Sequence, residues 1–117
     1  MTPMTDPKRL ECYTTALSFW SYTCYVHWKQ LAGDWVYAHL EGYTLGEIGR
    51  LMYEYVASGG EIDEVPETRT PWCEEFEFHH DLRLVLPSGR RLYVETVLDT
   101  GEKPDDSTIL VVNIHDA

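Results

Sequence analysis

The sequence is poor in positive charge, and this limits its partners. Lysine and arginine number 9 against 20 aspartate and glutamate residues, so the 117-residue chain has a formal net charge of −11. Proteins that hold nucleic acid mainly through phosphates rely on clustered lysine and arginine, and the longest basic run here is Arg90–Arg91. We therefore expect no general nucleic-acid binding, and for the same reason no binding to anionic membranes.

Long apolar runs and paired cysteines are also missing. No stretch approaches the roughly 18 apolar residues of a membrane span, and residues 1–9 lack the pattern of a signal peptide. Cys12, Cys24 and Cys73 are widely spaced and form no C-x-x-C pair, which excludes a zinc ribbon. This composition is typical of a cytoplasmic protein with reduced thiols, and we expect neither a metal nor another cofactor.

The first half of the chain has the periodicity of helices. After a disordered tip at residues 1–5, Asp6 and Pro7 have the residue types of a helix N-cap and first turn. Apolar residues three or four apart predict that this helix covers residues 7–31. At about 37 Å it would be longer than a four-stranded sheet is wide, so one end should overhang.

Two further helices are expected before residue 60. Gly33 should end the first helix, and a short one should follow at residues 35–40. Thr44 and Glu47 match a capping box for a third helix, which Gly59–Gly60 should end.

Beyond residue 60 the hydrophobic period changes from 3.6 to 2, which is typical of strands. The turn Pro87-Ser88-Gly89 predicts a hairpin, and two registers keep its apolar faces together, with Leu84 opposite either Leu92 or Val94. We expect one α+β domain over residues 1–117, in which helices of residues 6–58 pack on one face of a sheet. That sheet should be a four-stranded antiparallel meander within residues 60–117, with strands at 61–65, 76–86, 91–98 and 108–115.

Residues 39–117 contain the segments YTLGEIGRLMYEYVASGGEIDEVPE, FEFHHDLRLVL, RRLYVETVLD and ILVVNIHDA. This order of a glycine-ended helix, a strand rich in Ile and Glu and a three-stranded meander resembles the RelE/MqsR-type ribonuclease superfamily and a related domain family of unassigned function. The resemblance implies a metal-independent endoribonuclease toxin of a bacterial toxin–antitoxin system, whose activity can be degenerate. Its site would use His79, Arg83, Tyr93 and His115 as the base and the cation that RNA cleavage needs.

The acidity favours another function, because active members of that family are basic. We expect first a small acidic protein-binding or regulatory module that contacts a basic partner or associates with itself. Two groups of residues are candidates for that contact. They are the aromatic residues Phe19, Tyr22 and Tyr25, which lie off the main stripe of the first helix, and the carboxylates Glu74, Glu75 and Glu77.

A metal site at the histidines is not expected. His79, His80 and Asp81 are adjacent, and imidazole with carboxylate suits several transition metals. Neighbouring residues of a strand point to opposite faces, so only one of the two histidines can join a given site. We expect His80 to lie in the core.

Overall fold

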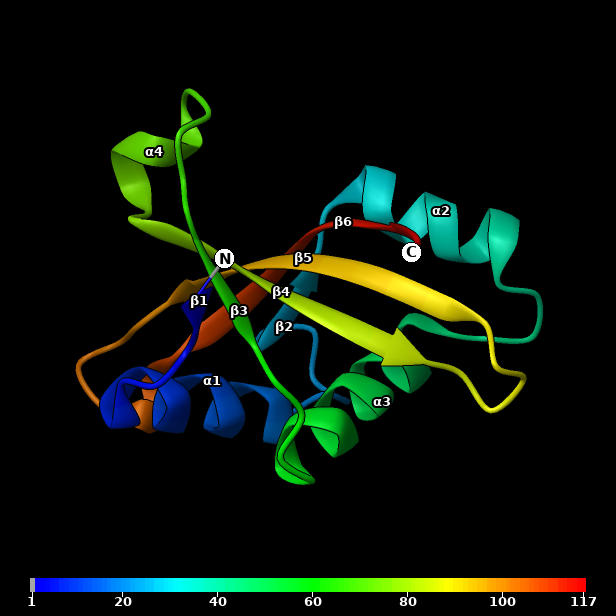
Figure 1. Ribbon diagram of the computed structural model, residues 1–117, viewed down its shortest axis with the longest axis horizontal. Coiled ribbons are helices and arrows are strands. Elements are labelled where there is room, and N and C mark those ends of the chain that lie inside the picture. The colour runs from blue at the N-terminus through cyan, green and yellow to red at the C-terminus, as the bar shows by residue number, and fades with distance from the viewer. Residues whose placement is uncertain (1) are drawn as a thin grey trace.

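Six strands form one twisted sheet in the order β1-β3-β4-β5-β6-β2 (Figure 1). The structure is a computed structural model and describes residues 2–117. The helices are α1 (Pro7–Ser18), α2 (Gln30–His39), α3 (Leu45–Ala57), α4 (Trp72–Glu75) and a 3-10 turn at Pro104–Asp106. The strands are β1 (Thr2–Pro3), β2 (Val26–Trp28), β3 (Asp63–Pro66), β4 (Phe78–Val85), β5 (Arg91–Asp99) and β6 (Thr108–Asp116).

The α+β class is confirmed, but the predicted four-stranded antiparallel sheet is too small. The four expected strands are β3 to β6, which pair antiparallel in sequence order. Two more strands extend the sheet at its edges: β1 pairs with β3, and β2 pairs with β6 in parallel. Both are too short to show a period in the sequence. The expected disordered tip instead contains β1, followed by the buried residue Met4.

The prediction of one helix over residues 7–31 is wrong. Helix α1 ends at Ser18, and the chain turns before β2 pairs with Ile109–Val111. Tyrosine, tryptophan, valine and threonine are weak helix formers that favour strands, so pairing with β6 decides the structure. The helix is about half as long as predicted, so the predicted overhang loses its basis. Leu31 lies in α2 instead, where its side chain is 80% exposed.

Helix α2 also differs from its prediction, whereas α3 agrees. Gly33 lies inside α2 and does not end a helix. The capping box of α3 is confirmed: the Glu47 N–H donates to Thr44 Oγ1 at 3.1 Å, and Glu47 Oε1 accepts from the Thr44 N–H. The helix ends before Gly59, whose φ of +91° favours glycine.

The β4–β5 hairpin adopts the first of the two registers considered. Leu84 lies opposite Leu92 and Leu82 opposite Val94, and Gly89 in the connecting turn has a φ of +88°. These leucine and valine side chains point to one face of the sheet. There they form a single core with the buried residues of α1, α2 and α3.

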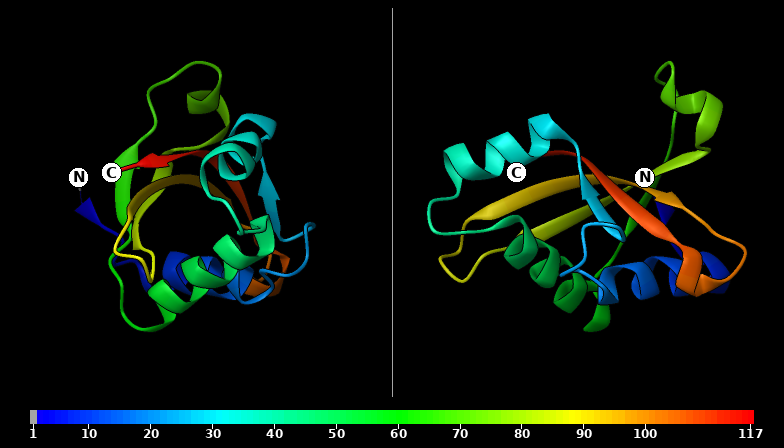
Figure 2. Two further views of the ribbon diagram at one scale, coloured as in Figure 1. Left: turned by 90° about the vertical axis from the view of Figure 1, so that its right-hand side faces the viewer. Right: turned by 180° about the vertical axis from the view of Figure 1, so that it is seen from behind.

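His80 lies on this core-facing side, as predicted, and is buried. Its Nε2 lies 3.2 Å from a carboxylate oxygen of Glu64, and burial lowers the pKa of its imidazole. Helices α1 and α3 lie on the opposite side of the sheet from α4 in all three views (Figures 1 and 2). Within residues 2–117, no helix has the length and apolar character needed to cross a membrane.

Candidate functional site

The face of the sheet turned away from α1 and α3, here called the outer face, is rich in charged side chains. Strand alternation places them there, because residues two apart share a face. Pairing of Asp81 with Glu95, Arg83 with Tyr93, and Tyr93 with His115 makes them neighbours across β4, β5 and β6. The polar residues of this face and its edge include Asp63, Glu67, Arg69, His79, Asp81, Arg83, Tyr93, Glu95 and His115.

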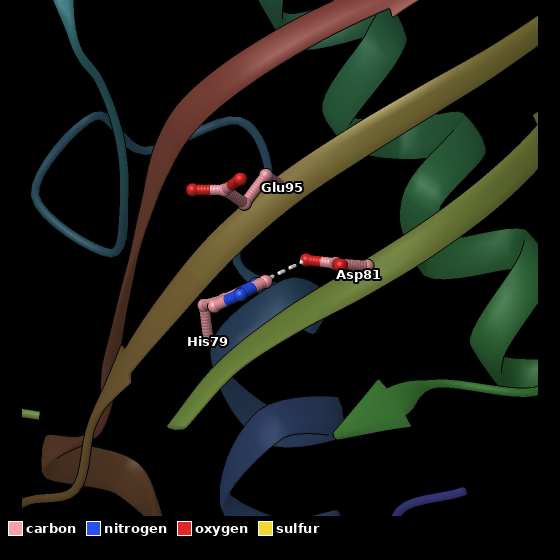
Figure 3. A group of neighbouring side chains, drawn as sticks. All are labelled: His79, Asp81 and Glu95. Atoms are coloured by element: carbon pink, nitrogen blue, oxygen red, sulfur yellow. Dashed lines mark hydrogen bonds and ion pairs between the residues drawn. The ribbon is translucent and has the colours of Figure 1, made fainter. Parts of the chain in front are cut away.

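His79 is held by a buried carboxylate. Its Nδ1 lies 2.8 Å from Asp81 Oδ1, and the Asp81 side chain is 0% exposed (Figure 3). The Tyr93 hydroxyl donates to the other carboxylate oxygen of Asp81. Because an ionised carboxylate can only accept, Nδ1 carries the proton in this pair, which leaves a lone pair on Nε2. This arrangement orients His79 for proton transfer.

Tyr93 connects this pair to the end of β6. Burial, together with its hydrogen bond to Asp81, raises the pKa of the Tyr93 hydroxyl, so it stays protonated. Its ring stacks on His115 with centroids 5.2 Å apart. Tyr93 therefore acts as a fixed donor to Asp81.

A guanidinium group is fixed by two carboxylates, one of which, Glu95, lies close to His79. Arg69 donates from Nε and Nη2 to the two oxygens of Glu67, at 2.9 Å each, and from Nη2 to Glu95 at 2.5 Å. The hydrogen bond from Arg69 lowers the pKa of Glu67 to about 2. Glu67 is buried, whereas the Arg69 side chain is 48% exposed. The site thus presents a rigid cation at its surface.

All four predicted catalytic residues lie on the outer face, but they do not converge on one point. Arg83 is four residues from His79 along β4, or about 13 Å at the usual strand rise. It pairs with Asp63, Nη2 to Oδ2 at 2.8 Å, and lies next to Tyr93 and His115. The group around His79 instead comprises Asp81, Glu95 and Arg69.

Sequence reasoning considered Asp81 only as a metal ligand, which it did not expect, and missed Glu95, Glu67 and Arg69 as site residues. Asp81 and Glu95 could have been found from strand alternation alone. In the predicted hairpin they share a face with His79 and Tyr93. Arg69 and Glu67 lie beyond the end of β3, and only the tertiary structure brings them to β5.

A cleft of about 490 Å³ adjoins this group on the outer face. Val97, two residues after Glu95 on β5, lines it together with Leu110. Aromatic side chains Trp28 and Phe76 also line the cleft, as do Lys29, Asp99 and Thr108. Its size is within the range of small-ligand pockets.

The two groups predicted to bind a partner lie apart. Phe19 and Tyr25 stack with centroids 4.5 Å apart and are half-buried, whereas Tyr22 is 58% exposed. They lie in the turn between α1 and β2, not on a helix. Glu74, Glu75 and Glu77 are exposed in and after α4 (Figure 1), where Glu75 and Glu77 line a pocket with Arg9, near the start of α1. The aromatic and acidic groups therefore do not form one surface.

The donor set at the site is also compatible with a cation. Ligand atoms of His79, Asp81 and Glu95 lie within 4.8 Å of one another, the one such group within residues 2–117. Each of these side chains already has a partner in the protein. His79 contacts Asp81, Asp81 accepts a hydrogen bond from Tyr93, and Glu95 accepts one from Arg69.

No family model, curated protein or solved structure matches this chain.

Proposed function

We propose that the outer face is the active site of an endoribonuclease that works by general acid–base chemistry. The observation that carries the proposal is His79, which is oriented by the buried carboxylate of Asp81 and lies close to Glu95, the carboxylate that binds the cation Arg69. A buried carboxylate that orients a histidine with a free nitrogen is a recurrent arrangement for proton transfer.

In the proposed reaction His79 is the general base. Its Nε2 removes the proton of a ribose 2′-hydroxyl while that oxygen attacks the adjacent phosphorus. The bond from phosphorus to the 5′-oxygen breaks on the opposite side, and a water molecule gives a proton to that leaving oxygen. The products are a 2′,3′-cyclic phosphate and a 5′-hydroxyl. Asp81 stabilises the imidazolium that forms, which then returns its proton to solvent.

Arg69 supplies positive charge for the phosphorane. Guanidinium has five N–H donors, and its Nε and Nη2 hydrogens already bind Glu67 and Glu95. Nη1 has only a long contact with Glu95, at 3.4 Å, so it keeps a donor for a phosphate oxygen. Fixed donors of this kind stabilise developing charge without reorganisation. The aromatic cleft beside the site offers room for a base of the RNA.

The test is cleavage of a short single-stranded RNA by the purified protein, analysed for 2′,3′-cyclic phosphate ends. We expect His79→Ala to lower kcat/KM by about 10²- to 10⁴-fold, the usual contribution of a general base. His39→Ala, at the exposed end of α2, is the matched control and should leave the rate unchanged. Equal rates for the two variants, or no cleavage by the wild type, would refute the proposal.

A second candidate is binding of a basic protein, because the carboxylates of Glu74 and Glu75 are exposed in α4 and have no hydrogen-bond partner within residues 2–117. The measurement is an NMR titration with a lysine-rich peptide. Shifts should centre on α4 and disappear in Glu74→Lys/Glu75→Lys but persist in Glu41→Lys, which reverses an exposed charge elsewhere. Shifts spread over all acidic surfaces would contradict this specific contact.

A further inference from the structure

We infer that His79, Asp81 and Glu95 form a binding site for a divalent transition-metal ion such as Zn²⁺. A second consequence, that the ion blocks RNA cleavage by occupying His79, rests on the proposed function. The metal site itself does not. The sequence argued against a metal because His79 and His80 diverge, but strand pairing supplies Glu95 as a third ligand.

The donor set suits such an ion in kind and in number. One imidazole nitrogen and two carboxylates are borderline-hard ligands that first-row divalent metals accept. They come from adjacent strands, with Asp81 directly opposite Glu95, so the backbone holds them together. Three protein ligands leave a fourth tetrahedral position for water, as in open zinc sites.

The distances require only small side-chain shifts. Ligand bonds of about 2.0–2.2 Å place the donors of a tetrahedral ion roughly 3.4 Å apart. In the structure the three donors lie within 4.8 Å of one another. His79 retains some exposure, so its ring can rotate toward the ion while Asp81 stays in place.

The charge of the outer face favours a cation. Four carboxylates are buried there: Asp63, Glu67, Asp81 and Glu95. The two guanidinium groups paired with them, Arg69 and Arg83, leave two negative charges without compensation when His79 is neutral. Unpaired charge is costly to bury, and a dication would neutralise it.

The present partners of the ligands are competitors of the ion. Arg69 holds Glu95, and the Tyr93 hydroxyl holds Asp81. Both contacts must open before the metal binds. Removal of Arg69 should therefore increase metal affinity. Removal of a nearby residue that does not compete with the ion for these ligands should leave the metal affinity unchanged or lower it.

The experiment is calorimetric titration with Zn²⁺ in a Cys24→Ser/Cys73→Ser background, which removes the two exposed thiols. We expect one ion per chain, at least tenfold weaker affinity in His79→Ala and Glu95→Gln, and about tenfold tighter affinity in Arg69→Ala. Glu41→Gln, an exposed carboxylate distant in the chain from all three ligands, is the control and should bind as the wild type does. Circular dichroism checks that each variant is folded. If Glu95→Gln is unfolded, the affinity of His79→Ala decides the test.

Any of three results would overturn the metal site. They are no stoichiometric binding of Zn²⁺, equal affinity in His79→Ala and wild type, and weaker binding in Arg69→Ala. RNA cleavage in EDTA together with absent Zn²⁺ binding would overturn the metal site alone. Zn²⁺ binding with this mutational pattern, but no cleavage in EDTA, would support the metal site and refute the ribonuclease.

Discussion

Replacement of Glu67 by glutamine should destabilise the protein in a pH-dependent way. The hydrogen bond from Arg69 lowers the pKa of Glu67 from 4.5 to about 2. A pKa difference of one between the folded and unfolded protein corresponds to about 1.4 kcal/mol, which sets an upper bound of roughly 3.4 kcal/mol. Half of the Arg69 side chain is exposed to solvent, which screens the pair, so we expect a cost of about 1–2 kcal/mol at pH 7.

The direction of the pH dependence follows from linkage between protonation and folding. A carboxyl group whose pKa is lower in the folded than in the unfolded protein stabilises the fold above its unfolded pKa, and this contribution is lost as pH falls through the folded pKa. The difference between wild type and Glu67→Gln should therefore be constant above about pH 5. It should then shrink between about pH 4.5 and pH 2.

The assay is thermal or urea unfolding of both proteins across this pH range. The expected loss corresponds to a fall in Tm of about 4–8 °C at pH 7. Glu41→Gln, an exposed carboxylate, is the control and should change stability by less than about 0.5 kcal/mol. A difference that persists unchanged to pH 2 would refute this explanation, because the loss would then come from packing and not from charge.

The charge of the molecule and its aromatic turn give three further predictions. Because both the chain and the outer face are net negative, RNA is repelled, and kcat/KM for RNA cleavage should rise between about 50 and 300 mM salt as screening increases; a fall would show that phosphate attraction dominates binding. Phe19→Ser should cost about 1–2 kcal/mol of unfolding free energy, since the ring is half-buried on Tyr25, whereas Tyr22→Ser should stay within about 0.5 kcal/mol. If the protein self-associates through this turn, Tyr22→Ser should shift its sedimentation profile to the monomer, and an unchanged profile would exclude that contact.

Local patterns were sufficient to predict α3 and the β4–β5 hairpin. The capping box at Thr44 and the glycine at position 59 mark the two ends of α3. Both act through contacts within a few residues, so sequence alone predicts this helix. Alternation along β4 separates His79 from His80 with no tertiary information, because successive side chains of a strand must point to opposite faces. The hairpin turn limits the register to two choices, of which the structure adopts the first.

The segment from α1 to β2 and the centre of the site required the tertiary structure. Residues 26–28 lie in a segment with helical spacing, and they become β2 only because β6, far along the chain, offers a strand to pair with. Arg69 belongs to a connection without a periodic pattern, and it reaches Glu95 because the chain after β3 folds over the outer face. The physical reason is the same in both cases. Periodicity reports which side of an element is buried, whereas the partner across a sheet or a loop contact depends on residues distant in the chain.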